Sequence, residues 1–143
     1  MRNRLCATLA CLTLLLAGVH GQQPSSSTAS LDFEFFKARV QPIFLAKRPG
    51  HARCIACHGQ GTPLRLQSLA PGNATWTEEE SRKNFEVIRR VAQPGNVQSR
   101  LLVHALDEKA GGDFYHNGGK HWSSQNDPEW QLLRTWILGT ASR

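Results

Sequence analysis

The residues Cys54-Ile-Ala-Cys57-His58 constrain this chain more than any other part of its sequence. Two thiols stand with two residues between them, and an imidazole directly follows the second thiol. This spacing serves a disulfide, a redox-active dithiol, half of a zinc site or the covalent attachment of a haem. Each of these sites needs a different chain around it, so the rest of the sequence has to decide among them.

The first 21 residues have the pattern of a secretory signal peptide. Arg2 and Arg4 precede an apolar run, 5–19, that is short for a membrane span. Val19 and Gly21 suit the small-residue positions of a cleavage site, which predicts a mature chain that begins near residue 22. We therefore expect an exported protein, located in the periplasm of a Gram-negative bacterium.

Cleavage changes the cysteine content of the chain. It removes 21 of the 143 residues, together with Cys6 and Cys11, so that only Cys54 and Cys57 remain. About 120 residues suffice for one domain with a modest core. Thiols in an exported protein are normally oxidised, so the two cysteines either pair with each other or are consumed by a ligand.

The charge pattern gives no sign of nucleic-acid binding. Without Arg2 and Arg4 the chain keeps 15 of its 17 Lys and Arg residues against 11 acidic residues, a net charge of +4. These basic residues are scattered and form no dense block interleaved with aromatic residues. No segment after the leader is apolar enough to cross a membrane.

Hydrophobic periodicity predicts a single all-α domain over 31–143, preceded by a flexible polar tether over 22–30. A first helix begins near residue 31, and Pro42 is expected to kink or interrupt it. A second helix over 77–92 opens with the capping-box pattern of Thr77 and Glu80. A short helix is expected over 99–106. The apolar residues expected on one face of the first two helices are Phe33, Phe36, Val40, Phe44, Phe85, Ile88 and either Val91 or Ala92.

The last helix has the clearest signals. Asp127 is expected to cap it, Pro128 to take its first position, and an apolar face to pack on the first helix. That face consists of Trp130, Leu133, Trp136 and Ile137. Long connections lie between the helices, and long loops in so small a domain usually surround something large.

Covalently bound haem c explains the motif better than the other sites do. The two thiols of Cys54 and Cys57 would form thioethers with the haem, and His58 would ligate its iron from the same side. A zinc site would need His116 and His121 as well, but 58 residues separate Cys57 from His116, far more than in a zinc finger. A thioredoxin-like dithiol belongs in an alternating strand and helix chain, which this is not. We also expect a carbonyl in the 60–63 loop to accept a hydrogen bond from His58.

Several segments together resemble small c-type cytochrome domains of acidobacterial and planctomycete proteins. They are FEFFKARVQPIF, CIACHG, SRLLVHAL, HNGGKHW and DPEWQLLRTWI, and they extend over about residues 33–140. The resemblance implies a class I-like cytochrome c fold, in which the first and last helices cross beside one haem. It also implies a role in electron transfer.

The second axial ligand departs from the common class I pattern. Met1 is the only methionine and leaves with the leader, so we expect either a histidine in place of the usual methionine sulfur or an open site. His116 is the preferred ligand, because it begins the H-x-G-G motif of the resembled family in a glycine-rich loop. His121 and His104 remain alternatives, whereas His51 is expected on the surface. The expected walls of the haem pocket and core near this loop are Phe114, Tyr115 and Trp122.

Three functions are consistent with these residues. The first is a periplasmic, non-enzymatic cytochrome that passes single electrons between redox partner proteins through a bis-histidine haem. The second is a five-coordinate haem that binds a small gas or turns over peroxide, as the missing methionine suggests. The third is a docking subunit of a respiratory complex at the membrane.

Overall fold

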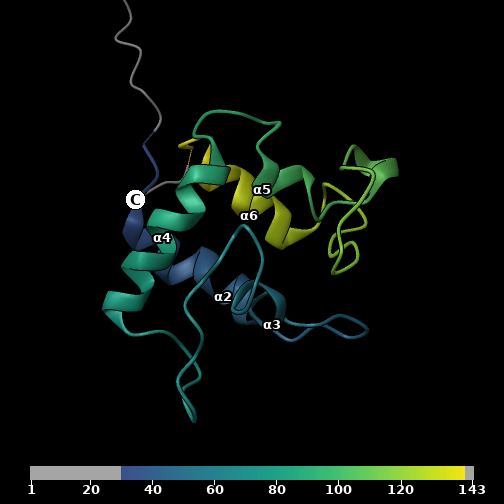
Figure 1. Ribbon diagram of the computed structural model, residues 1–143. Helices are drawn as coiled ribbons and strands as arrows, with labels where there is room; N and C mark the ends of the chain where they lie inside the picture. The colour runs from purple at the N-terminus through teal and green to yellow at the C-terminus, as the bar shows by residue number, and fades with distance from the viewer. Residues whose placement is uncertain (1–29, 141–143) are drawn as a thin grey trace, which may run out of the picture.

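The computed structural model describes residues 30–140, and this part of the chain is all-α (Figure 1). The expected leader and all but the last residue of the expected tether lie outside the described residues. No strand forms within 30–140; two isolated bridges pair Arg48 with His51 and Leu106 with Trp122. The elements are α1 (Phe33–Phe35), η1 (Phe36–Val40), α2 (Gln41–Leu45), α3 (Cys54–His58), α4 (Glu78–Ala92), α5 (Arg100–Val103), η2 (Glu108–Ala110) and α6 (Pro128–Ile137).

The first helical segment runs without interruption through α1, η1 and α2. Asp32 caps its start, where its Oδ1 accepts a hydrogen bond from Phe35 N–H at 2.8 Å. Directly before Pro42 the chain widens into the π-helix η1, and Gln41 N–H bonds to the Phe36 carbonyl five residues back. A π-helical stretch changes the ladder in which the proline ring would otherwise clash. Pro42 therefore does not interrupt the helix; the winding changes instead.

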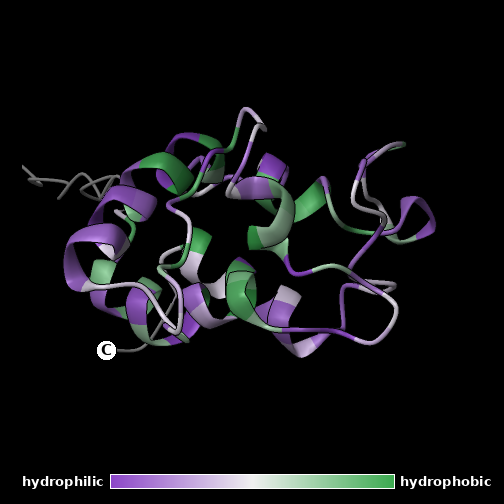
Figure 2. Ribbon diagram, turned by 60° about the horizontal axis from the view of Figure 1, so that its bottom comes forward, coloured by the Kyte–Doolittle hydropathy of each residue, from purple (hydrophilic) through white to green (hydrophobic). Residues whose placement is uncertain are grey.

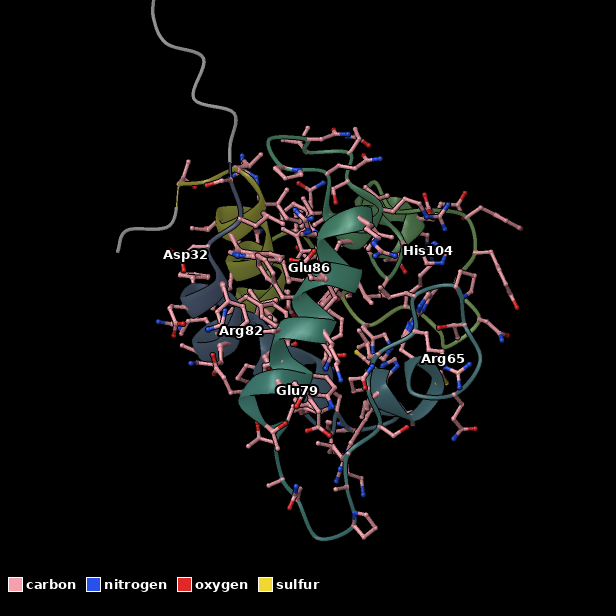
Figure 3. All side chains as sticks on the ribbon, turned by 60° about the vertical axis from the view of Figure 1, so that its left-hand side comes forward. Asp32, Arg65, Glu79, Arg82, Glu86 and His104 are labelled. Atoms are coloured by element: carbon pink, nitrogen blue, oxygen red, sulfur yellow. The ribbon has the colours of Figure 1, made fainter. Side chains whose placement is uncertain are left out.

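Helix α4 forms as its capping box predicts. Thr77 Oγ1 accepts from Glu80 N–H at 3.3 Å, and Glu80 Oε2 accepts from Thr77 N–H at 2.8 Å. Ile88 and Ala92 are fully buried. The outer face carries ion pairs one turn apart, including Glu78 with Arg82; Figure 3 labels Glu79, Arg82 and Glu86 along this helix. Such exposed pairs add little stability, so the apolar face fixes the position of α4.

The first and last helices pack on each other, as predicted. The rings of Phe36 and Trp136 lie 5.7 Å apart, and Trp136 Nε1–H donates to the Asp32 carbonyl at 2.9 Å. In α6, Asp127 caps the helix, Pro128 takes its first position, and all four predicted apolar residues are buried. The helices in Figure 2 carry both hydrophobic and hydrophilic stretches, consistent with one face in the core.

Two elements differ from expectation. The CIACH motif forms the short helix α3, which was not among the expected helices, and α5 covers only Arg100–Val103 of the predicted 99–106. The connection from α5 to α6, green to yellow in Figure 1, projects away from the other helices. Within residues 30–140, none of the helices has the length and apolar composition that a bilayer span requires.

Candidate functional site

Five histidines from distant parts of the chain gather beside α3. His51 precedes α3, His58 ends it, His104 follows α5, and His116 and His121 lie in the connection between α5 and α6. The five rings form a series in which each ring lies beside another. The distances between ring centres are 6.3 Å for His58–His116, 4.9 Å for His104–His116, 5.7 Å for His116–His121 and 5.0 Å for His51–His121.

The ring of His58 is fixed through its Nδ1 atom. This nitrogen lies 2.9 Å from the Leu64 carbonyl oxygen and 2.8 Å from Thr62 Oγ1, and the Thr62 hydroxyl donates to the same carbonyl at 2.8 Å. Because a carbonyl can only accept, Nδ1 carries the proton and Nε2 keeps a free lone pair. Thr62 lies inside the loop expected to hold His58, and the carbonyl belongs to Leu64, just beyond it. Leu66 N–H also donates to the His58 carbonyl at 2.7 Å.

His116 is held in the same way. Its Nδ1 lies 2.5 Å from the Gly119 carbonyl oxygen, so its Nε2 is also left with a free lone pair. Gly119 adopts a positive φ of 78°, which a glycine tolerates without strain, and this turn brings its carbonyl back toward the ring. Burial lowers the pKa of His116 below its ordinary value, although the bond to Gly119 opposes the shift. A neutral imidazole is the form that binds a metal.

The rings of His58 and His116 lie close enough to each other for both to reach one metal. Their ring centres are 6.3 Å apart, and the two planes are stacked at an angle of 20°. An imidazole nitrogen coordinates a metal at about 2 Å and its ring centre lies roughly 1 Å further, so two such ligands have centres roughly 6 Å apart. The residues that the sequence assigned to a haem are therefore brought together with a compatible spacing.

The two cysteines stand next to this pair in α3, and neither forms a disulfide. Cys54 is partly buried, with its Sγ 3.9 Å from Arg48 Nη1, whereas Cys57 is exposed. Burial raises the pKa of the Cys54 thiol, and the nearby Arg48 charge opposes that shift. Two free thiols beside His58 fit the thioether attachment that the motif predicts.

The remaining histidines have different partners. His104 is partly buried, and its Nδ1 lies 2.7 Å from Asp113 Oδ2, so this nitrogen is committed to a carboxylate. Burial, with smaller effects from the charges of Arg48 and neighbouring histidines, lowers the pKa of His121 to about 4. His121 Nδ1 is buried without a hydrogen-bond partner among the described residues. His51 is partly buried against His121, so its expected place on the surface is wrong in part.

The aromatic residues near His116 separate into two groups. Trp122 is buried and its Nε1 lies 3.4 Å from Glu129 Oε2, so it belongs to the core as expected. Phe114 and Tyr115 are 84% and 61% exposed, so the prediction that they belong to the core is wrong, whereas their place in the wall of a haem pocket stays a prediction. Both directly precede His116 in the loop, and the Tyr115 hydroxyl donates to Asn117 Oδ1 at 2.8 Å.

One glycine of this connection serves a purpose that the sequence did not reveal. A Cβ atom on Gly112 would lie 1.9 Å from the Leu106 carbonyl oxygen. The absence of a side chain therefore lets the backbone at Gly112 lie against the backbone of Leu106 and Asp107, between α5 and η2. Gly112 N–H donates to the Asp107 carbonyl at 2.9 Å, so this glycine allows a tight turn of the chain.

Sequence reasoning also missed the polar partners of the site. Thr62 and Asp113 hold His58 and His104, and Arg48 Nε donates to Glu129 Oε2 at 2.9 Å. The last contact joins the segment before α3 to α6 across 81 residues. No local pattern indicates such a pairing, whereas a hydroxyl close after His58 is a signal that could have pointed to Thr62.

Within residues 30–140, no set of three or more His, Cys, Asp or Glu side chains is grouped to hold a metal ion by itself. The four residues of the zinc alternative therefore do not form such a group. Comparisons with protein-family models, with curated proteins and with solved structures found no significant match to this chain.

Proposed function

We propose that this protein is an exported monohaem c-type cytochrome that transfers single electrons between redox partners. Cys54 and Cys57 would hold the haem through thioethers, and His58 and His116 would bind its iron. The protein works in the periplasm, and its partners are other redox proteins, with a respiratory complex at the membrane among the candidates.

One observation supports this proposal most directly. His58 and His116 come from segments 58 residues apart in the sequence, yet their ring centres lie 6.3 Å apart. Each ring directs Nδ1 to a backbone carbonyl and keeps Nε2 free. Carbonyl partners of this kind fix the orientation and the protonation state of histidines that bind a metal.

The protein's own contribution is to fix the position and the protonation state of the His58 and His116 imidazoles. A haem with two nitrogen ligands supplies a one-electron iron couple, generally at a lower potential than with a methionine ligand. The carbonyls of Leu64 and Gly119 would hold both rings in one orientation, so the two imidazoles would need little rearrangement when an electron is transferred. Burial favours the neutral form of His116, the form that binds a metal, because it lowers the pKa of this imidazole.

Visible spectra of the purified holoprotein test the proposal. We expect a low-spin ferric spectrum without the far-red band of a methionine ligand, and sharp α and β bands after reduction. His116→Ala should convert the ferric iron to high spin, because it removes the second nitrogen. His121→Ala and His104→Ala are matched controls from the same cluster and should keep the low-spin spectrum.

The gas-binding hypothesis predicts the opposite result. An open iron would give a high-spin ferric spectrum in the unchanged protein, and its reduced form would bind carbon monoxide rapidly. Loss of the low-spin spectrum in the His121 or His104 variant, with His116→Ala unaffected, would instead transfer the role of second ligand to that histidine.

A further inference from the structure

The segment that carries His116 is attached to the carbonyl groups at the end of α5. The last carbonyls of a helix have no partner within the helix. Here the carbonyls of Val103, the last residue of α5, and of His104 and Ala105, which follow it, accept from Asp113 N–H at 2.9 Å, Lys120 Nζ at 3.3 Å and His121 N–H at 2.8 Å. The donors from Asp113 and His121 are backbone amides, whereas the donor from Lys120 is its side-chain ammonium.

Lys120 also closes the loop that presents His116. Its ammonium donates a second hydrogen bond to the Asp113 carbonyl, so it joins residues on both sides of His116. The lysine is partly buried, and an ammonium has three donors for such carbonyls. A positive charge is also favourable at the C-terminal end of a helix. Lys120 thus ties both ends of 113–120 to the residue after α5.

The tip of this loop has little else to hold it. Phe114 and Tyr115 are exposed, and Gly118 and Gly119 give the backbone wide conformational freedom. His116 contacts Gly119 inside the same loop, so that bond orients the ring but does not attach the loop to the rest of the molecule. The position of His116 relative to His58 therefore depends on the base of the loop.

We propose that Lys120 is a positioning residue for the second axial ligand: its ammonium closes the 113–120 loop and holds His116 facing His58. This role rests on the proposed function, in which His116 binds the iron. Lys120 touches neither the ligand atom nor the metal; it acts through the backbone carbonyls of His104 and Asp113.

Three variants of the holoprotein test the role of Lys120. Lys120→Met keeps the length of the side chain and removes its charge and donors, whereas Lys120→Arg keeps both and should rescue the protein. Lys109→Met is the matched control, because Lys109 is exposed and its ammonium makes no hydrogen bond within the described residues. We would measure the ferric spin state, the rate of carbon monoxide binding after reduction, and hydrogen exchange of the 113–122 amides.

The expected result is specific to Lys120→Met. Loss of two charge-assisted hydrogen bonds should speed carbon monoxide binding and the exchange of the Asp113 and His121 amides by about tenfold or more. A high-spin fraction should appear, while the arginine variant and Lys109→Met behave like the unchanged protein. Spectra, binding rates and exchange that are the same in Lys120→Met and the unchanged protein would overturn the role of Lys120.

The two proposals can fail separately. If the unchanged holoprotein is not low-spin, the proposed function fails, but the exchange measurement still decides whether Lys120 holds the loop. If the unchanged protein is low-spin and all three variants match it, the proposed function stands and Lys120 is not a positioning residue.

Discussion

At the scale of single residues, the partner of Nδ1 distinguishes the histidines. His58 and His116 direct this atom to carbonyls, which accept a hydrogen bond from it and leave the lone pair of Nε2 free. His104 directs it to the Asp113 carboxylate, in a polar network with Arg100. The sequence places all three near glycines or apolar residues, and only the backbone geometry separates the two proposed ligands from His104.

The two cysteines of α3 should differ in reactivity when no haem is attached. The thiolate is the reactive form, and burial raises the pKa of Cys54, so less of its thiolate is present near pH 8. Cys57 is also more exposed. We expect iodoacetamide to modify Cys57 several times faster than Cys54 in protein made without haem, as measured by mass spectrometry of the peptides.

The haem-loaded protein provides the control for this reaction. Its thiols are consumed by thioethers under our proposal, so neither cysteine should be modified even after denaturation. Modification of both cysteines in denatured holoprotein would contradict covalent attachment, and equal rates in the haem-free chain would contradict the burial of Cys54.

At the scale of elements, sequence predicts best where the signal is local. The capping box of α4 and the Asp-Pro start of α6 concern residues within one turn, and both helices begin as predicted. The end of α5 was predicted too late, because the carbonyls of residues 103–105 bond to the 113–122 segment and do not continue the helix. The π-helical winding before Pro42 likewise depends on packing that no pattern records.

The cap of α4 gives a prediction at this scale. Thr77→Ala removes the oxygen that accepts from Glu80 N–H and should lower the free energy of unfolding by about 1 kcal/mol. Thr77→Ser should retain most of the stability, since serine caps equally well. Urea unfolding followed by circular dichroism measures both.

Ser123→Ala is a suitable control for the cap, because Ser123 is exposed and its side chain makes no hydrogen bond within the described residues. It should change the free energy of unfolding by less than about 0.5 kcal/mol. A Thr77→Ala protein as stable as this control would show that the capping box adds nothing to α4.

At the scale of the whole molecule, the chain divides into a packed half and a loop half. The first helical segment, α4 and α6 share an aromatic cluster in which the rings of Phe36, Phe85 and Trp136 lie 5.5 to 6.2 Å apart. The loop half carries the five histidines, and its segments 59–64 and 113–121 contain mostly exposed or partly exposed residues.

This division explains how much of the site the sequence could predict. The motif at Cys54 and Cys57 is local, and the preference for His116 came from a resemblance. The contacts that hold the site, such as Arg48 with Glu129 and Lys120 with Asp113, join residues whose proximity only the complete fold creates. The wrong assignment of Phe114 and Tyr115 to the core has the same origin, because burial of a loop residue depends on what covers it.

Under the proposed function, the same division predicts that haem attachment would stabilise the two halves unequally. A chain with Cys54→Ala and Cys57→Ala cannot form thioethers, and its loop half loses the ligand that would order it, while the aromatic cluster keeps its contacts. Regions with few buried apolar contacts open at lower free energy than packed helices. Compared with the holoprotein, we expect amides of 59–64 and 113–121 to exchange at least about tenfold faster, and those of α4 and α6 to change by less than about threefold.

Hydrogen exchange with mass spectrometry compares the double cysteine variant with the holoprotein. The quantity that decides the outcome is the acceleration of exchange in the loop half relative to that in the packed half. A conservative control is Cys57→Ser alone, which keeps one thioether through the partly buried Cys54. The exchange rates of its loop amides should fall between those of the double variant and those of the holoprotein. Equal acceleration in both halves would mean that the aromatic cluster also needs the haem, so that the molecule folds as a single cooperative unit. Unequal acceleration would mean that the helices form the scaffold first and that the loops of His58 and His116 become ordered around the cofactor.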